Sequence, residues 1–294
     1  MEERAIYINK CIEDMLKWRH NDSYPNCTDN TNKIEICDDN TEPTGFELQN
    51  KIIKDMFGCN NPNYCSANIT KDDIHRQLIV LDSLYTTNIE RMREFGLEEI
   101  AEAIWKLCDN GAGVYALGNL TTKLGITNPL HPQITNIFSG KYGYIKGIQN
   151  TSAPSLLSKY FFFAAIACNN NGNWGFPIYD TIAKEMMVKV QGFLGIPQTR
   201  ISSNSSINIS QYVMGMKSIV DTLSISNPSL WSNVYKFELL DYFLWHVGKA
   251  GHKSYSLLMT KNEIMACYSN GEITKLPKRI TDWQDIYNKL QHYK

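Results

Sequence analysis

The most restrictive feature of the sequence is its longest apolar run, Tyr160–Cys168, which follows directly after Lys159. A helix that crosses a membrane needs roughly 20 apolar residues, so this run is too short to span a bilayer. The run must instead be buried inside a globular protein. The charge on Lys159 then either reaches solvent or is held inside for a reason. Asp180, which follows behind a proline and a tyrosine, raises the same question.

The composition fits a globular protein of one large domain or two small ones, because 43% of the 294 residues are hydrophobic and 20% are charged. The first residues, MEERAIYINKC, are charged and lack the apolar core of a signal peptide. We therefore expect a cytoplasmic protein without membrane contact. The net charge of -1 argues against binding nucleic acid through bulk charge alone, but it does not exclude a local basic face.

The cysteines give no sign of a metal centre. The chain has 8 cysteines but no C-x-x-C pair, so a zinc site or an iron–sulfur cluster has little support. Without a secretion signal, free thiols are favoured over disulfides. We therefore expect neither a metal nor a cofactor.

Apolar residues recur at helical spacing through most of the chain, which predicts a largely helical protein. Asp72 is the predicted N-cap of the third helix. Strand signal appears only near the end, where a β-hairpin is predicted over residues 264–276 around Asn270-Gly271. The predicted helices cover residues 2–19, 46–57, 72–84, 97–107, 114–124, 152–168, 178–194, 208–224, 228–248 and 282–292.

The predicted fold class is therefore mainly α with a small C-terminal β-hairpin. The segments 21–45 and 59–68 are polar and rich in turn residues, which indicates loops. We expect the chain to have three parts. Residues 1–69 would form N-terminal helices and a long polar loop, residues 70–250 a helical core, and residues 251–294 a hairpin and helix packed on that core.

Lys159 and Asp180 each have an ordinary structural interpretation. A lysine near a helix start can lay its stem on apolar surface while its ammonium reaches water, and an aspartate before a helix is a favoured N-cap. Together, however, they lie near the starts of two helices that a short loop joins, so an amine and a carboxylate could face one pocket. Desolvation makes part of a lysine neutral and nucleophilic, and a helix dipole keeps an aspartate ionised. Such a pair suits a reaction through a sugar oxocarbenium ion.

Two segments resemble the helix–hairpin–helix DNA glycosylases, the superfamily of endonuclease III and 8-oxoguanine glycosylase. The segments are SLLSKYFFFA, which begins at Ser155, and FPIYDTIA, which begins at Phe176. These enzymes carry a hairpin that ends in Gly-x-Lys and, further along the chain, a Pro-x-Asp-Thr segment. Lys159 and Asp180 stand at the lysine and aspartate positions of this pattern. The chain departs from it at Asn150-Thr-Ser-Ala-Pro-Ser, which replaces the usual Leu-Pro-Gly-x-Gly hairpin whose glycines let backbone amides approach a phosphate.

The resemblance is most specific over residues 150–195 and is to a divergent branch similar to the 8-oxoguanine glycosylases. It implies a two-layer helical fold with a central cleft, and a monomer that acts on double-stranded DNA. It makes Lys159 the nucleophile on C1′ of the nucleotide and Asp180 the carboxylate that assists departure of the base, a chemistry compatible with AP-lyase activity. The implied substrate is an oxidised guanine in DNA repair. The alternative is a hypermodified cytosine, such as a glucosylated one, in defence against phage, which the divergent hairpin and the long N-terminal insertion permit.

A glycosylase grips a flipped base between aromatic or apolar side chains and holds the DNA backbone through phosphate contacts. The candidates for the base pocket are Tyr85, Trp174, Phe176, Trp245 and His246, and for each of them ordinary core packing is the alternative. The candidates for DNA contact are Lys141, Lys146, Ser152, Ser155, Lys249 and Lys253. Two other classes stay open: a non-catalytic helical module that binds DNA or a protein, and a helical protein unrelated to glycosylases in which Lys159 lies on the surface.

Overall fold

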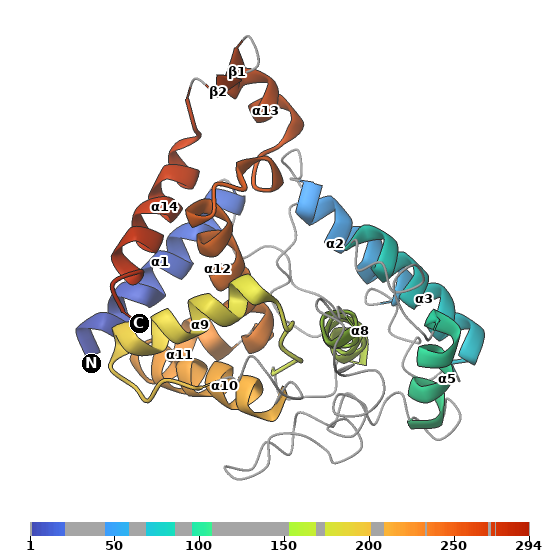
Figure 1. Ribbon diagram of the computed structural model, residues 1–294. Helices are drawn as coiled ribbons and strands as arrows, with labels where there is room; N and C mark the ends of the chain where they lie inside the picture. Colours follow the sequence, from blue (N-terminus) through green and yellow to red (C-terminus); the bar gives the residue numbers. More distant parts are fainter. Residues whose placement is uncertain are drawn as a thin grey trace. The chain divides into compact units, whose positions relative to one another are not determined.

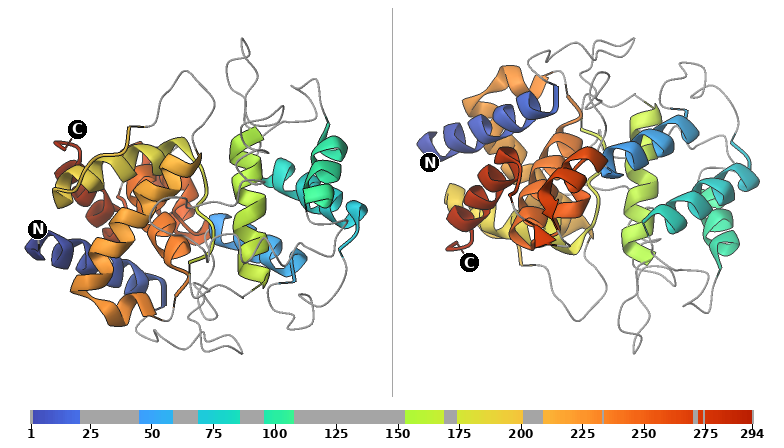
Figure 2. Two further views of the ribbon diagram at one scale, coloured as in Figure 1. Left: turned by 90° about the horizontal axis from the view of Figure 1, so that it is seen from below. Right: turned by 90° about the horizontal axis from the view of Figure 1, so that it is seen from above.

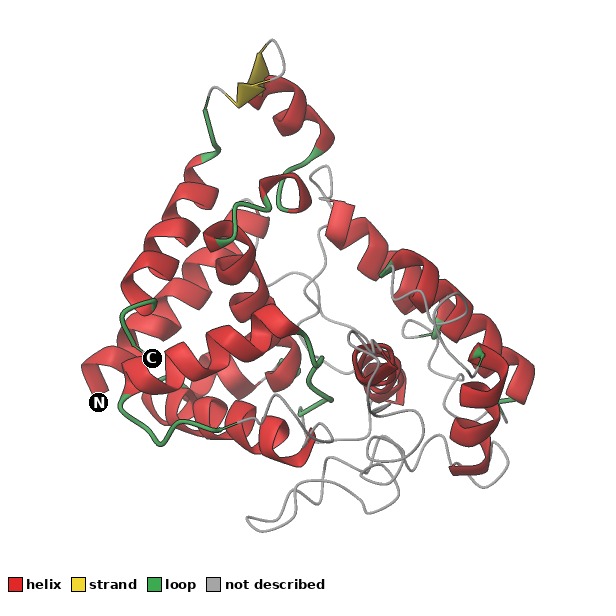
Figure 3. Ribbon diagram, in the orientation of Figure 1, coloured by secondary structure: helices red, strands yellow, loops and turns green. Residues whose placement is uncertain are grey.

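The computed structural model shows a mainly helical chain, as the apolar spacing predicts (Figures 1 and 3). Within the described part of the chain, no helix is both long and apolar enough to cross a membrane. The helix predicted over residues 114–124 lies outside the described residues. The structure describes residues 2–20, 45–58, 69–85, 96–107, 153–168, 174–200, 209–232, 234–269, 272–273 and 275–293.

Most of the predicted helices are confirmed to within a few residues. The cap of α3 is Thr70 rather than the predicted Asp72, because the Thr70 hydroxyl accepts a hydrogen bond from the Asp73 amide at 3.1 Å and Asp73 bonds back to the Thr70 amide. The elements are α1 (Glu2–His20), α2 (Gly45–Met56), α3 (Lys71–Leu84), α5 (Leu97–Leu107), α8 (Ala153–Cys168), α9 (Thr181–Leu194), α10 (Ile209–Ser226), α11 (Pro228–Ser232), α12 (Lys236–Gly251), η2 (Tyr255–Leu257), α13 (Lys261–Cys267), β1 (Tyr268–Ser269), β2 (Glu272–Ile273) and α14 (Lys278–Leu290).

The chain forms two compact units that do not follow the predicted division into three consecutive parts. Unit 1 comprises Met1–Lys51, Thr181–Gln198 and Gly215–Lys294, whereas unit 2 comprises Ile52–Asp180 and Thr199–Met214. Both units are therefore discontinuous in sequence, and helices α2 and α10 contribute residues to each of them.

Helix α8 forms the core of unit 2. All its residues from Leu156 to Ala167 are buried, which explains why the sequence is apolar around the whole helix. Phe57 packs against two of its rings, with centroid distances of 5.4 Å to Tyr160 and 5.6 Å to Phe163. Helix α3 lies beside α8 and also packs on α5 (Figure 2). Each fully buried aromatic side chain contributes on the order of 2 kcal/mol, so this cluster stabilises unit 2.

Helix α12 forms the core of unit 1, where it packs on both α9 and α14. Two glycines of α12 allow this close approach. A Cβ atom at Gly248 would lie 2.2 Å from Ile182 Cγ2 in α9, and one at Gly251 would lie 2.2 Å from Tyr287 Cγ in α14. Real Cβ atoms never come so close to a carbon atom, so a side chain at either position would push the helices apart.

The Gly251→Ala substitution is expected to lower the free energy of unfolding by about 2 kcal/mol, because the new methyl overlaps the Tyr287 ring near its base, where rotation cannot clear it. Urea denaturation followed by circular dichroism measures the change. Gly192→Ala is the comparison: its Cβ would meet Gln198 Nε2, the end of a flexible side chain, and would lie 3.1 Å from Tyr293 Cβ, a contact that a shift of a few tenths of an ångström relieves. The control should change stability by less than about 1 kcal/mol. Equal losses in both variants would contradict the close contact of α12 with α14.

A buried polar network ties the first helix to the second half of the chain. Asn9, only 2% exposed, donates to the Leu223 carbonyl at 2.9 Å and accepts from Trp231 Nε1 at 2.9 Å. The single helix predicted over 228–248 is wrong, because the chain breaks between α11 and α12, where Tyr235 adopts extended backbone with ψ 107°. The break lets Trp231, at the end of α11, reach Asn9.

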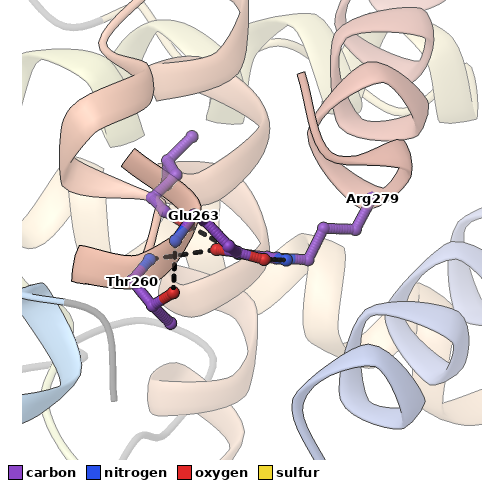
Figure 4. A network of polar contacts seen from close by, with 4 residues as sticks. Thr260, Glu263 and Arg279 are labelled. Carbon is purple, nitrogen blue, oxygen red and sulfur yellow. Dashed lines mark hydrogen bonds and ion pairs between the residues drawn. The ribbon is translucent and has the colours of Figure 1, made fainter. Parts of the chain in front are cut away.

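The structure does not support the β-hairpin that the sequence predicts over residues 264–276. Its first strand is largely helical, because residues 264–267 belong to α13, and pairing is limited to Tyr268 with Ile273 and Ser269 with Glu272. The reason is a capping box that starts α13. The Thr260 hydroxyl accepts from the Glu263 amide at 3.2 Å, and the Glu263 carboxylate accepts from the Thr260 amide at 3.0 Å (Figure 4).

The same Glu263 carboxylate holds α14 to α13. It accepts two hydrogen bonds from the Arg279 guanidinium, which also donates to the Leu258 carbonyl at 3.1 Å (Figure 4). Burial raises the pKa of Glu263, but the bonds from Arg279 and Thr260 outweigh burial and hold that pKa below its usual value. A carboxyl with a lowered pKa stabilises the fold above the pKa of the unfolded chain, and this contribution is lost as pH falls through the folded pKa.

The Arg279→Met substitution is therefore expected to lower the free energy of unfolding at pH 7 by about 2 kcal/mol. The difference between variant and wild type should begin to shrink as the pH falls below the usual glutamate pKa of about 4.3, and it should disappear below the lowered pKa of folded Glu263, where this carboxyl is protonated in both proteins. Denaturant titrations across this pH range measure it. A difference that stays constant with pH would mean that Arg279 acts through packing alone.

Candidate active site around Lys159

Lys159 is a buried charged residue in the second turn of α8. Only 6% of its surface is exposed, so it is not the surface lysine of the ordinary interpretation. Its Nζ donates a hydrogen bond to Ser155 Oγ, one helical turn earlier, at 2.5 Å. The same Nζ lies 4.7 Å from the centroid of the Tyr85 ring, at the end of α3. The hydroxyl and the ring are both favourable partners for a lysine side chain held inside the protein.

Ser158, next to Lys159 in the chain, connects α8 to the segment that carries Asp180. Its side chain is completely buried and donates to the Ser155 carbonyl at 2.9 Å. Its Oγ also accepts a hydrogen bond from the Tyr179 amide at 2.8 Å. The residues directly after the two bonded partners are Lys159 and Asp180. The bond thus brings the backbone near Asp180 next to the backbone near Lys159, within unit 2.

Further contacts fix the segment from Phe176 to Asp180. The Phe176 ring packs on Phe161 of α8 with centroids 5.6 Å apart. The Tyr212 hydroxyl donates to the Ile178 carbonyl at 2.7 Å, and its ring lies 5.2 Å from that of Tyr179. Burial raises the pKa of the Tyr179 phenol, which stays neutral. The segment is therefore anchored at Phe176, Ile178 and Tyr179 before it reaches Asp180.

Asp180 is half-buried and directly precedes α9. The predicted helix over 178–194 begins three residues later than expected, at Thr181, because the segment before it is extended along these anchors. That the carboxylate and the Lys159 amine face one cleft stays a prediction.

The Ser158→Ala substitution is expected to lower the free energy of unfolding by about 2 kcal/mol, because it leaves the Tyr179 amide and the Ser155 carbonyl without this partner. Chemical denaturation gives the size of the effect. Ser256→Ala, at an exposed position, is the control and should leave stability unchanged. If both variants unfold like the wild type, the Ser158 bridge does not hold the Tyr179 segment.

The base-pocket candidates divide between the two units. Tyr85, Trp174 and Phe176 belong to unit 2, and among them Tyr85 contacts Lys159. Phe176 is 1% exposed and packed on Phe161, so the core-packing alternative holds for it. Trp174 is half-buried.

Trp245 and His246 lie on α12, in unit 1. His246 is 2% exposed, its Nδ1 donates to the Tyr242 carbonyl at 2.7 Å, and its ring lies 5.0 Å from Trp283, so it is a packed core residue. Trp245 is half-buried, with Lys249 Nζ 5.3 Å from its ring centroid.

The candidates for DNA contact also lie in different parts of the structure. Lys141, Lys146 and Ser152 lie outside the described residues. The Ser155 hydroxyl contacts Lys159. Lys249 is half-buried, and Lys253 is exposed at the end of α12.

Sequence reasoning missed the roles of Ser155 and Ser158 in supporting the lysine. The available signal was two serines inside an otherwise apolar helix, since buried hydroxyls in proteins are hydrogen-bonded. Among the described residues, no group of three histidine, cysteine or acidic side chains could hold a metal ion. Cys11 and Cys267 are buried free thiols.

Comparison with known proteins returns no match to a protein-family model, to a curated protein or to a solved structure.

Proposed function

We propose that the chain is a DNA N-glycosylase that excises a damaged or modified base through Lys159 and Asp180. The observation that carries the proposal is the Ser158–Tyr179 hydrogen bond of 2.8 Å, because the residue after each partner is one of the two catalytic candidates. Burial of the amine adds support, since a lysine nucleophile works in its neutral form and burial disfavours the ammonium.

In the proposed mechanism, the neutral Lys159 amine attacks C1′ of a flipped-out nucleotide. The electrons of the N-glycosidic bond leave with the base, which takes up a proton, and the amine nitrogen becomes bonded to C1′. The Asp180 carboxylate stabilises the positive charge that develops on the sugar. The adduct can open to an imine, from which β-elimination would give AP-lyase activity, or water can hydrolyse it.

Tyr85 has a place in this mechanism. A flipped base stacks on aromatic side chains, and the Tyr85 ring already lies beside the lysine amine. A base that stacks on this ring would replace the lysine amine on its face. The arriving substrate would thereby free the amine from this contact at the moment when the nucleophile is needed.

The proposed substrate is either 8-oxoguanine-like damage or a hypermodified cytosine of phage DNA. The test incubates the protein with duplexes that contain 8-oxoguanine, glucosylated hydroxymethylcytosine or only ordinary bases, and measures the released base by mass spectrometry. We expect release from one modified duplex and none from the ordinary one. Absence of release from every modified duplex would overturn the proposal.

The second candidate is a non-catalytic helical module that binds DNA or a protein. The observation that favours it is that the Lys159 amine already has partners in Ser155 and Tyr85, an arrangement that could serve only to keep a buried charge stable. Borohydride distinguishes the two functions, because it reduces an imine between lysine and sugar to a stable adduct. DNA binding with neither base release nor a trapped adduct would support the module.

A further inference from the structure

The segment from the end of α12 to the first two residues of α14 carries an excess of positive charge. We call residues 252–279 the C-terminal arm; it contains η2, α13, β1 and β2 of unit 1. Its charged residues other than histidine are Lys253, Lys261, Glu263, Glu272, Lys275, Lys278 and Arg279. The arm is thus basic although the whole chain has a net charge of -1. Because Arg279 is bonded to Glu263, the excess charge lies on the lysines.

The lysines of the arm lie at its surface. Lys253, Lys261, Lys275 and Lys278 are all exposed. In unit 1, α13 and the two short strands extend beyond the ends of α12 and α14, at the top of the view in Figures 1 and 3. A group of exposed lysines raises the local concentration of an anionic partner around it.

Three large apolar side chains are exposed among these lysines. Met265 is 72% exposed, Leu257 44% and Tyr268 39%. On α13, Met265 follows Lys261 by four residues, so the two side chains lie on the same face of the helix. The arm therefore offers apolar contact together with positive charge.

The backbone of Lys253 is in the left-handed region, which is strained for a residue other than glycine. It is the non-glycine residue with positive φ in the described chain, at 58°, directly after the C-cap of α12. Directly after Lys253, the Ser254 amide donates a hydrogen bond to the Lys249 carbonyl at 2.9 Å, which is the hydrogen bond of a Schellman motif. Glycine is the usual residue at such a position because it adopts positive φ without strain. Strained backbone persists where the side chain has a use, and here the side chain is an exposed lysine.

We propose that the C-terminal arm is a docking surface for the backbone of double-stranded DNA. Its lysines contact phosphates, and Met265 and Tyr268 contact the sugars and groove edges between them. An anionic membrane fits less well, because the exposed face of α13 has only Met265 and Ala266 as apolar residues, whereas an interfacial helix needs a broad apolar face. A protein interface also fits less well, because lysine is depleted there.

This inference goes beyond the proposed base excision and stands without it, because phosphate contact requires no chemistry. The test therefore uses a short duplex of ordinary bases. Fluorescence anisotropy measures the affinity at several salt concentrations for the wild type and for the triple variant Lys253→Gln, Lys261→Gln, Lys275→Gln. The log of the affinity decreases with the log of the salt concentration, and the triple variant should make this dependence shallower by about 0.9 for each phosphate contact removed.

The control is a triple variant with the same change in charge elsewhere in unit 1: Lys10→Gln, Lys17→Gln, Lys51→Gln. These lysines are exposed outside the arm, so the slope should remain that of the wild type. A fall of equal size in both triple variants would show that bulk charge, and not the arm, binds DNA. A wild type that does not bind the duplex, or that binds vesicles of equal parts phosphatidylcholine and phosphatidylserine more tightly, would overturn the proposal.

Two single variants separate binding from folding. Lys253→Gly relieves the positive φ, so its melting temperature should rise by about 2 °C while its salt slope falls. Met265→Gln changes an exposed side chain, so it should bind several-fold more weakly with the slope and the melting temperature unchanged. Wild-type affinity in both variants would contradict the assigned contacts, whatever the stability of the triple variant.

Discussion

Replacing Lys159 with glutamine is expected to reduce base excision by on the order of 10⁴-fold or more, because a neutral amide cannot form a bond to C1′. Glutamine has similar length and its amide can still donate to Ser155, so the fold should persist. The measurement is single-turnover release of the base from the modified duplex that the wild type cleaves. Borohydride should trap the wild type on this DNA and should give no adduct with the variant.

The matched control for this variant is Lys184→Gln, in the first turn of α9, where a lysine is lost without any role in the proposed site. It should keep wild-type excision and trapping. Wild-type excision by the Lys159→Gln enzyme would remove Lys159 from the mechanism. Excision that depends on Lys159 without a trapped adduct would instead mean that water is the nucleophile and that the lysine acts through its charge.

Asp180→Asn is expected to slow excision by on the order of 100-fold while DNA binding is retained, because the neutral amide no longer stabilises the positive charge on the sugar. The segment before Asp180 should stay in place, since its anchors at Phe176, Ile178 and Tyr179 do not involve the carboxylate. Single-turnover rates and anisotropy on the same duplex separate the two effects.

Asp72→Asn provides the comparison for this substitution, because Asp72 is an exposed carboxylate in the first turn of α3. It should leave the rate unchanged. If Asp180→Asn excises at the wild-type rate, the carboxylate serves only the start of α9. If it loses DNA binding together with activity, Asp180 acts on the ground state rather than on the developing charge.

The sequence predicts α8 well because the signals for this helix are local. An apolar run that is too short for a membrane must be buried, and the structure buries it throughout. The lysine within it could be identified as unusual for the same reason. What periodicity could not supply is the partner of each polar group. The contacts from Lys159 to Tyr85 and from Ser158 to Tyr179 join residues far apart in the chain, and no spacing rule encodes them.

The predictions that were wrong also rest on one local pattern where another contact decides the structure. The Asn270-Gly271 signal and the β-branched residues around it favour a hairpin, but the Thr260–Glu263 capping box lies just upstream and starts a helix through the predicted strand. The helix predicted over 228–248 is interrupted between α11 and α12, and this break lets Trp231 bond to Asn9, more than half the chain away. Ser155 is a plausible phosphate contact in the sequence, and its bond to Lys159 becomes visible only when α8 is built.

The discontinuity of the two units has a consequence for the order in which the protein forms as it is synthesised. Unit 2 is nearly complete once the ribosome has passed Asp180, whereas α1 finds its partners for Asn9 only when Leu223 and Trp231 have emerged. At elongation rates of about 5–20 residues per second, these partners emerge roughly tens of seconds after α1 itself. During that time the face of α1 that carries Ile8, Ile12 and Met15 has no core to join, so the nascent chain exposes apolar side chains that the finished fold buries.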